Sequence, residues 1–247
     1  MENYNENNVV EIGGKISSEI EISHELFEEK FYKFTIDTKR LSDLADEIPI
    51  IVSERLVDLS TFEKGEHVCI KGQFRSYNQV LNGKSKLVLS IFAKEIVKAS
   101  IQDDILTLNE ASFIGYICKN PIYRKTPLGR EIADVLVAVN RSYKKSDYIP
   151  CILWGRNAKF CETLGVGSKV KLSGRIQSRK YEKKLEDGTI LPKVAYELSV
   201  SKFSVNRDNE QKQQIIDSDE KVEQNLEENI DNNIDLNIEK SSKEELI

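Results

Sequence analysis

One pattern of strands and glycines occurs twice in this 247-residue chain, and the second copy follows the first at a nearly constant distance. Corresponding positions lie 101 or 102 residues apart: Asn8 with Asn109, Ile48-Pro49 with Ile149-Pro150, Gly65 with Gly167, and Gly72 with Gly174. Because a fixed offset is difficult to obtain by chance, the sequence predicts a tandem duplication of one domain. The length also favours two domains of about 100 residues.

Each copy predicts five strands, with a short helix between the third and the fourth. In the first copy the strands are expected at 8–20, 31–37, 48–53, 67–77 and 86–96, with the helix at 54–62. In the second copy they are expected at 109–118, 131–141, 148–154, 168–179 and 193–204, with the helix at 156–164. This order is that of the OB-fold, a small Greek-key barrel. The predicted fold class is therefore all-β, with tandem OB-folds at 1–99 and 105–205 and a disordered acidic tail at 206–247.

Charge is distributed unevenly along the chain. Residues 1–104 carry 13 Lys and Arg against 19 Asp and Glu, and residues 206–247 carry 5 against 13, so both parts are acidic. Residues 105–205 carry 18 against 9, and this basic character is hidden in the overall net charge of −5. A basic domain between acidic segments is the candidate for contact with a polyanion.

The cysteines and histidines form no metal-binding or disulfide pattern. No CxxC pair occurs, only two histidines are present, and the four cysteines are widely spaced at Cys69, Cys118, Cys151 and Cys161. We therefore expect no metal or cofactor, and cysteines that act as small buried apolar residues. No apolar run approaches the roughly 20 residues of a membrane span, and the first residues do not resemble a signal peptide, so a cytoplasmic protein is expected.

Aromatic and basic residues interleave between Asn140 and Tyr181, in the basic domain. Flat rings hold unpaired bases by stacking, while neighbouring cations neutralise the phosphates that connect those bases. The interleaved residues are Tyr143, Tyr148, Trp154 and Tyr181 among Arg141, Lys144, Lys145, Arg156, Arg179 and Lys180. The pattern predicts a surface for single-stranded nucleic acid.

Residues 113–182 resemble the core of bacterial single-stranded DNA-binding proteins. Four segments carry the resemblance: N-P-x-x-R-x-T-P-x-G at 120–129, A-D-x-x-x-A-V-N-R at 133–141, I-P-C-x-x-W-G at 149–155, and L-x-x-G-x-x-V-x-x-x-G-R-x-Q-S-R-x-Y at 164–181. Each segment is weak alone, but together they cover most of the second domain. The resemblance implies a non-catalytic OB-fold protein that coats and protects single-stranded DNA in replication, recombination and repair, largely independently of base sequence.

The resemblance also implies which residues contact DNA. The family's four base-stacking positions are aromatic here, at Tyr143, Tyr148, Trp154 and Tyr181. Its phosphate-contacting positions are basic here, at Arg124, Arg156, Arg179 and Lys180, with Arg141, Lys144 and Lys145 nearby. A structural role competes with this assignment, because a tyrosine at a strand end often belongs to the barrel rim and a single tryptophan can plug the core.

The first domain departs from this pattern. At the same offset, Glu47 stands in place of Tyr148 and Ser53 in place of Trp154, while Ser42 lies near the place of Tyr143; only Tyr77 matches the Tyr181 block. An acidic domain without these aromatic residues is expected to bind DNA weakly or not at all. We expect it to serve assembly, partner contact or a small auxiliary contact with the strand.

The C-terminal residues 206–247 contain no aromatic residue and no proline, and they are rich in Asn, Glu, Asp and Gln, which predicts disorder. In the family, an acidic tail with an apolar tip recruits replication and repair enzymes. The resemblance implies this role for Glu244, Glu245, Leu246 and Ile247, although the family's usual proline-phenylalanine tip is absent. A purely solubilising tail is the alternative.

Other functions compete with DNA coating. A metal nuclease requires clustered carboxylates, whereas the nine acids of residues 105–205 are scattered. A primosomal or plasmid accessory protein that acts mainly as a docking module would bind DNA weakly, and RNA is compatible with the same stacking chemistry. Family members combine four barrels, so a homodimer is expected by analogy.

Overall fold

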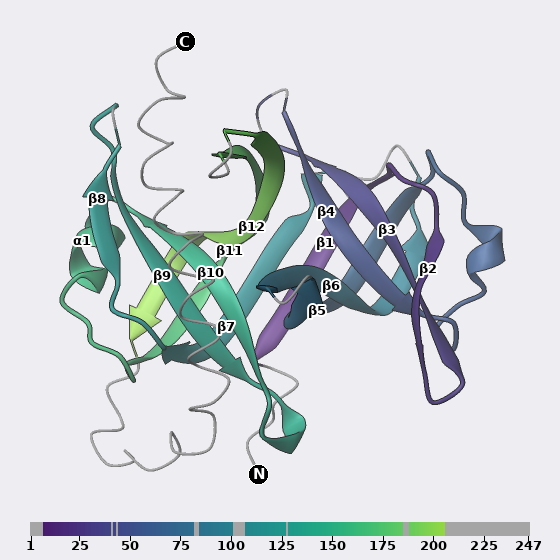
Figure 1. Cartoon of the computed structure of the whole chain (residues 1–247), viewed down its shortest axis with the longest axis horizontal. Coiled ribbons are helices and arrows are strands. Elements are labelled where there is room, and N and C mark those ends of the chain that lie inside the picture. The colour runs from purple at the N-terminus through teal and green to yellow at the C-terminus, as the bar shows by residue number, and fades with distance from the viewer. Residues whose placement is uncertain are drawn as a thin grey trace.

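The computed structural model describes residues 7–40, 42, 44–81, 84–100, 107–126, 128–184 and 188–205. Within these ranges the chain forms two β-barrels that lie side by side (Figure 1). The expected tail, with its tip from Glu244 to Ile247, lies outside the described residues.

The first barrel has six strands: β1 (Asn8–Ile16), β2 (Glu21–Leu26), β3 (Glu29–Lys39), β4 (Ala45–Ser53), β5 (His67–Leu81) and β6 (Lys84–Lys98). Strand β1 pairs with both β3 and β5, and β4 pairs in parallel with β6, which closes the barrel. The five predicted strands are present. The sequence patterns did not predict β2, which is an edge strand with exposed side chains on both faces.

The second barrel repeats this plan with β7 (Asn109–Ile117), β8 (Ile122–Lys125), β9 (Glu131–Asn140), β10 (Ser146–Trp154), α1 (Arg156–Cys161), β11 (Lys169–Lys184) and β12 (Ile190–Val205). Strand β7 pairs with β9 and β11, and β10 pairs in parallel with β12. These pairings match those of the first barrel one by one. The predicted tandem OB-fold is confirmed.

Strands β1 and β7 join the two barrels. They pair in an antiparallel manner, with Val10 opposite Ala111, and these two residues are themselves equivalent in the repeat (111 − 10 = 101). A pseudo-twofold axis therefore passes through this pair, and one twelve-stranded sheet runs through both barrels. The buried core is continuous across the junction, where the rings of Phe74 and Phe113 lie 6.3 Å apart.

The repeated asparagines have the same structural role in both barrels. The side chain of Asn8 donates to the carbonyl of Phe74 at 2.7 Å and accepts from its N–H at 2.8 Å. The side chain of Asn109 makes the same two bonds with Ile176, both at 2.8 Å. Each asparagine thereby satisfies a backbone N–H and a carbonyl that the neighbouring strand leaves unpaired.

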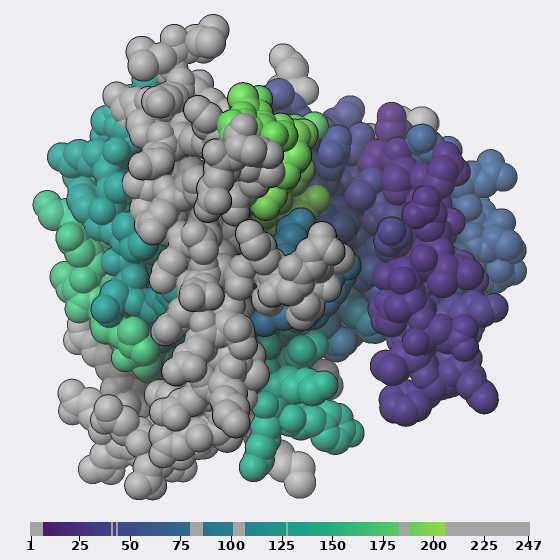
Figure 2. Space-filling model, viewed as in Figure 1, coloured from purple at the N-terminus to yellow at the C-terminus, as the bar shows by residue number. Residues whose placement is uncertain are grey.

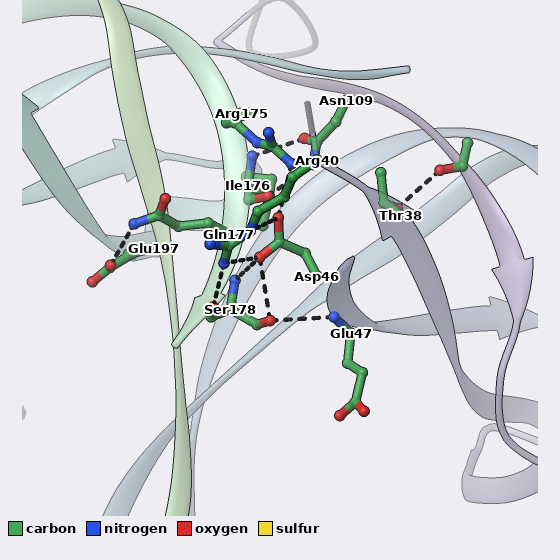
Figure 3. Close-up of polar contacts among 11 residues, drawn as sticks. Thr38, Arg40, Asp46, Glu47, Asn109, Arg175, Ile176, Gln177, Ser178 and Glu197 are labelled. Carbon is green, nitrogen blue, oxygen red and sulfur yellow. Dashed lines mark hydrogen bonds and ion pairs between the residues drawn. The ribbon is translucent and has the colours of Figure 1, made fainter. Parts of the chain in front are cut away.

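Asp46 is the centre of a buried polar contact between the barrels (Figure 3). Its carboxylate accepts from Arg40 Nη2 at 2.6 Å, from Arg175 Nη2 at 2.8 Å and from the backbone N–H of Ser178 at 2.8 Å. Arg175 and Ser178 belong to β11, whereas Asp46 belongs to β4 of the first barrel. Charge and hydrogen bonding therefore fix how the β11–β12 hairpin lies on the first barrel.

Asp147, the pseudo-equivalent of Asp46, makes a sparser contact. It accepts from the N–H of Ser76 at 2.7 Å and lies 3.3 Å from Arg141 Nε. Burial raises the pKa of Asp147, while the Ser76 N–H and the arginines Arg141 and Arg75 lower it by less. The Asp46 and Asp147 contacts therefore occupy symmetry-related positions, but the Asp46 carboxylate has more hydrogen-bond partners.

The barrels differ most where a helix was expected between the third and fourth predicted strands. In the second barrel, α1 packs against β9 and β10 and buries Ala158 and Cys161. In the first barrel, the expected helix over 54–62 is only a 3-10 turn at Leu59–Thr61. Asp58 caps this turn by accepting from the N–H of Ser60 at 3.0 Å.

Candidate nucleic-acid interface

Strand β10 places two of the predicted stacking residues on the outer face of the second barrel. Its side chains alternate, so that Asp147, Ile149, Cys151 and Leu153 point inward and are buried. Tyr148 and Trp154 occupy the opposite parity and therefore share the outer face. They are six positions apart, which is about 20 Å along a strand, so the two rings cannot hold the same base.

Trp154 stands at the end of β10 with its ring partly open to solvent. It is 38% exposed, and its indole Nε1 donates to Ser199 Oγ of β12 at 3.1 Å. The core next to it is filled by other residues, among them Leu153, which is fully buried. The ring is therefore held in place by one hydrogen bond while part of its surface remains accessible.

Tyr143 lies in the turn between β9 and β10, which projects from the second barrel (Figures 1 and 2). It is 94% exposed and has a left-handed backbone conformation, with φ 63° and ψ 34°. The N–H of Arg141 donates to the carbonyl of Lys145 at 2.7 Å and closes the turn. Lys144 and Lys145 are also exposed, so this turn presents a ring and two cations to solvent.

Tyr148 is half-buried and lies at the boundary with the first barrel. It packs against Leu136 of the second barrel, against which Cys118 and Leu87 of β6 also pack. Its N–H donates to Ser76 Oγ of β5 at 2.8 Å. The first barrel therefore positions this tyrosine, a contribution that the sequence of the second barrel alone could not reveal.

Tyr181 is the most enclosed of the four predicted stacking residues. It is only 8% exposed and lines a cavity of about 160 Å³ between the barrels. Residues 86–89 of β6 form one wall of this cavity, and Arg179 and Tyr196 line it from the second barrel. Burial raises the pKa of Tyr181. Because Tyr181 is almost fully buried, a base can stack on this ring only if the residues that enclose it move.

The predicted phosphate-binding residues fall into two groups. Four have carboxylate neighbours: Arg124 with Asp134 at 2.7 Å, Arg141 with Asp147 at 3.3 Å, Arg179 with Glu197 at 3.5 Å, and Lys180 with Glu47 at 3.5 Å. Three are exposed and form no ion pair with any described residue: Lys144, Lys145 and Arg156. The second group lies at the turn before β10 and directly after β10, next to Tyr143 and Trp154.

The first barrel has no comparable surface at the equivalent positions. Glu47 is exposed where Tyr148 stands in the second barrel, and Ser53 donates its hydroxyl to Glu29. Ser42 is exposed, and Tyr77 is 50% exposed on β5. Of the residues expected to stack bases, the first barrel therefore retains one isolated ring.

The described residues give no sign of a metal centre. No group of three His, Cys, Asp or Glu side chains among them is arranged to hold an ion. Cys151 and Cys161 are buried, whereas Cys69 and Cys118 are partly exposed, and burial raises the pKa of the Cys161 thiol to about 11. Among the same residues, no helix has the length and apolar character needed to cross a membrane.

The fold is similar to that of solved structures of a bacterial single-stranded DNA binding protein. The crystal structure of the wild-type single-stranded DNA binding protein from Thermus aquaticus matches with a TM-score of 0.64 at 14% identity, over 83% of this chain and 95% of that one. A deletion mutant of the same protein matches with a TM-score of 0.61 at 16% identity. At these identities the likeness concerns the fold, and it defines this molecule as a tandem OB-fold protein.

Sequence comparison assigns the family. Residues 108–216 match the single-strand binding protein family. The single-stranded DNA-binding protein B of Bacillus subtilis is 39% identical over 84 residues, which cover 30% of this chain and 72% of that protein. The single-stranded DNA-binding protein 1 of Staphylococcus aureus is 37% identical over 82 residues, which span about half (49%) of its length. The chain belongs to the single-strand binding protein family, and the resemblance found in the sequence is confirmed.

Proposed function

We propose that this protein binds single-stranded DNA largely independently of base sequence, and that it coats and protects the strand in replication, recombination and repair. The observation that carries the proposal is the outer face along β10, where Tyr143 and Trp154 are accessible beside exposed cations. Relatives that share this region are named single-stranded DNA-binding proteins. We further propose that the protein is not an enzyme.

Base stacking supplies the sequence-independent part of the binding. Trp154 and Tyr143 offer ring surface, and Tyr148 offers the exposed part of its half-buried side chain. Each stacked base contributes about 1–3 kcal/mol, and every base has a π-face, so no particular base is selected. Tyr181 is a fourth platform only when the residues that enclose it move, so binding at that position includes the cost of opening its surroundings.

Phosphate contacts supply the electrostatic part. Lys144, Lys145 and Arg156 meet phosphates without first breaking an ion pair to a described residue. Arg124, Arg179 and Lys180 contact phosphate by exchanging or sharing their carboxylate partners. Arg141 remains near the buried Asp147 and contributes mainly through its charge.

The other parts of the chain have supporting roles in this proposal. The acidic first barrel binds DNA weakly, because its equivalent positions hold Glu47 and Ser53 instead of aromatic rings. The C-terminal residues, ending in Glu244, Glu245, Leu246 and Ile247, recruit replication and repair proteins. Two copies of the chain assemble four barrels, and the protein acts in the bacterial cytoplasm on the nucleoid.

The test is a titration of the intact protein with poly-dT while the fluorescence of Trp154, the single tryptophan, is followed at two salt concentrations. We expect strong quenching, because a base covers the indole. The logarithm of the affinity should fall with the logarithm of salt concentration by roughly 0.7 per phosphate neutralised.

Two results would contradict the proposal. Tight binding with unchanged Trp154 fluorescence would place the strand elsewhere on the molecule. Absence of binding at low salt would favour a docking protein built on the same fold. A parallel titration with poly-rU distinguishes DNA from RNA, since stacking alone does not separate the two sugars.

A further inference from the structure

An open pocket lies at the end of the first barrel, outside the proposed DNA interface. Its volume is about 860 Å³. It is enclosed by the connection between β4 and β5, by residues 19 and 20 before β2, and by Tyr32 of β3. No step of the proposed function uses this pocket.

The connection that lines the pocket differs in structure from its equivalent in the second barrel. In the second barrel the β10–β11 connection forms α1, whose residues Ala158 and Cys161 are buried against the barrel. Strand β9, which α1 contacts, carries the fully buried Ala133 at the position equivalent to Tyr32 (133 − 32 = 101). In the first barrel the connection has only the 3-10 turn at Leu59–Thr61; its Leu59 and Phe62 are buried in the core, and the connection lines the pocket.

The pocket combines an apolar floor with an acidic rim. The floor is formed by side chains that are buried or half-buried: Ile20, Tyr32, Val57, Leu59 and Phe62. Around it lie four exposed carboxylates and one lysine: Glu19, Glu54, Asp58, Glu63 and Lys64. The lysine lies 3.5 Å from Glu19, so the rim retains an excess of negative charge.

We propose that this pocket binds a short amphipathic helix of a partner protein, with an apolar face toward the half-buried Ile20, Tyr32 and Val57 and with lysine or arginine beside the acidic rim. In the second barrel the equivalent connection is itself such a helix, since α1 buries Ala158 and Cys161 and carries Arg156 and Lys159 on its exposed side. The rim excludes nucleic acid by charge repulsion. It also disfavours the chain's own residues 206–247, which carry 13 acids against 5 bases.

The probe is a synthetic peptide of residues 153–166 of this chain, with Cys161→Ser, added to the isotope-labelled full-length protein. Backbone amide shifts are followed by NMR up to millimolar peptide. We expect saturable shifts at Val57, Leu59 and Phe62. The same peptide with Arg156→Glu and Lys159→Glu should bind about five- to tenfold more weakly, because its charges then oppose the rim.

Protein variants locate the site. Val57→Trp fills the pocket and should abolish the shifts. The double variant Glu54→Lys, Glu63→Lys should weaken binding about five- to tenfold while leaving the floor intact. Glu95→Lys, the same kind of substitution at one exposed position of β6, should leave binding unchanged.

Several outcomes would overturn the proposal: no shifts at millimolar peptide, shifts confined to the second barrel, or equal peptide binding by the Glu54→Lys, Glu63→Lys variant and the Glu95→Lys variant. Shifts at Val57 and Leu59 on addition of a dT oligonucleotide would assign the pocket to nucleic acid instead.

Discussion

The Asp46 contact allows a quantitative test of how the barrels are held together. In the variant Asp46→Ala, Arg40 and Arg175 lose their shared carboxylate and the N–H of Ser178 loses its acceptor. Removal of one partner from a buried ion pair costs about 3–5 kcal/mol. The arginine side chains are 30% and 29% exposed, so water compensates part of this loss. We therefore expect the free energy of unfolding to fall by about 3 kcal/mol.

Asp147→Ala is the matched control, because Asp147 occupies the pseudo-equivalent position. It accepts one backbone hydrogen bond and has one guanidinium at 3.3 Å, so its loss should cost only about 1–2 kcal/mol. Urea unfolding at pH 7, followed by circular dichroism, gives both values. Equal losses in the two variants, or a loss below about 1 kcal/mol for Asp46→Ala, would refute the argument that the richer contact contributes more.

Three further predictions concern single positions. Tyr143→Ala should weaken poly-dT binding about 5- to 150-fold, the equivalent of 1–3 kcal/mol, without changing stability, whereas Tyr77→Ala on the first barrel should leave the affinity nearly unchanged in the same titration. Gly174→Ala should lower the free energy of unfolding by about 1–3 kcal/mol, because a Cβ there would lie 2.0 Å from the Ser199 carbonyl oxygen; urea unfolding would show the reasoning to be wrong if the change were neutral. The pKa of Asp147 is raised in the folded state, so folding favours the protonated carboxyl. The free energy of unfolding of the wild type, relative to that of Asp147→Asn, should therefore increase as the pH falls from 7 toward 4. Urea midpoints measured across that pH range test the sign.

The architecture could be predicted because short stretches of the sequence indicate each strand. Alternation of apolar and polar residues predicted ten strands, and the fixed offset between copies predicted that their order repeats. The prediction of a helix over 54–62 was wrong for a physical reason. Leu56, Leu59 and Phe62 have helical spacing, but Leu56 is 37% exposed, and a short helix that lacks packing on its apolar face does not form. Asp58 caps a 3-10 turn, and this turn forms in place of the predicted helix.

The candidate site was only partly predictable, because the two barrels cover parts of each other. Tyr143, in the turn before β10, and Trp154, the last residue of β10, were predicted from the family motifs to stack bases, and both side chains are exposed. Tyr181 occupies a position of the same kind, but it is almost fully buried and lines the cavity between the barrels. This cavity is lined by residues about 95 positions apart (181 − 86), and no pattern within the second barrel indicates their proximity.

The pairing of β1 with β7 has a consequence for how the two halves can evolve. When two identical subunits meet on a twofold axis, every substitution appears on both sides of the interface at once, so each side must remain complementary to itself. Here both halves belong to one polypeptide, and each can change alone. Gln73 and Arg175 occupy equivalent positions (175 − 73 = 102), and only the arginine reaches a buried carboxylate across the junction. Because the halves are tethered, their association does not depend on protein concentration, and dilution does not separate them. Because the two copies are joined in one chain, neither barrel is required to resemble the other.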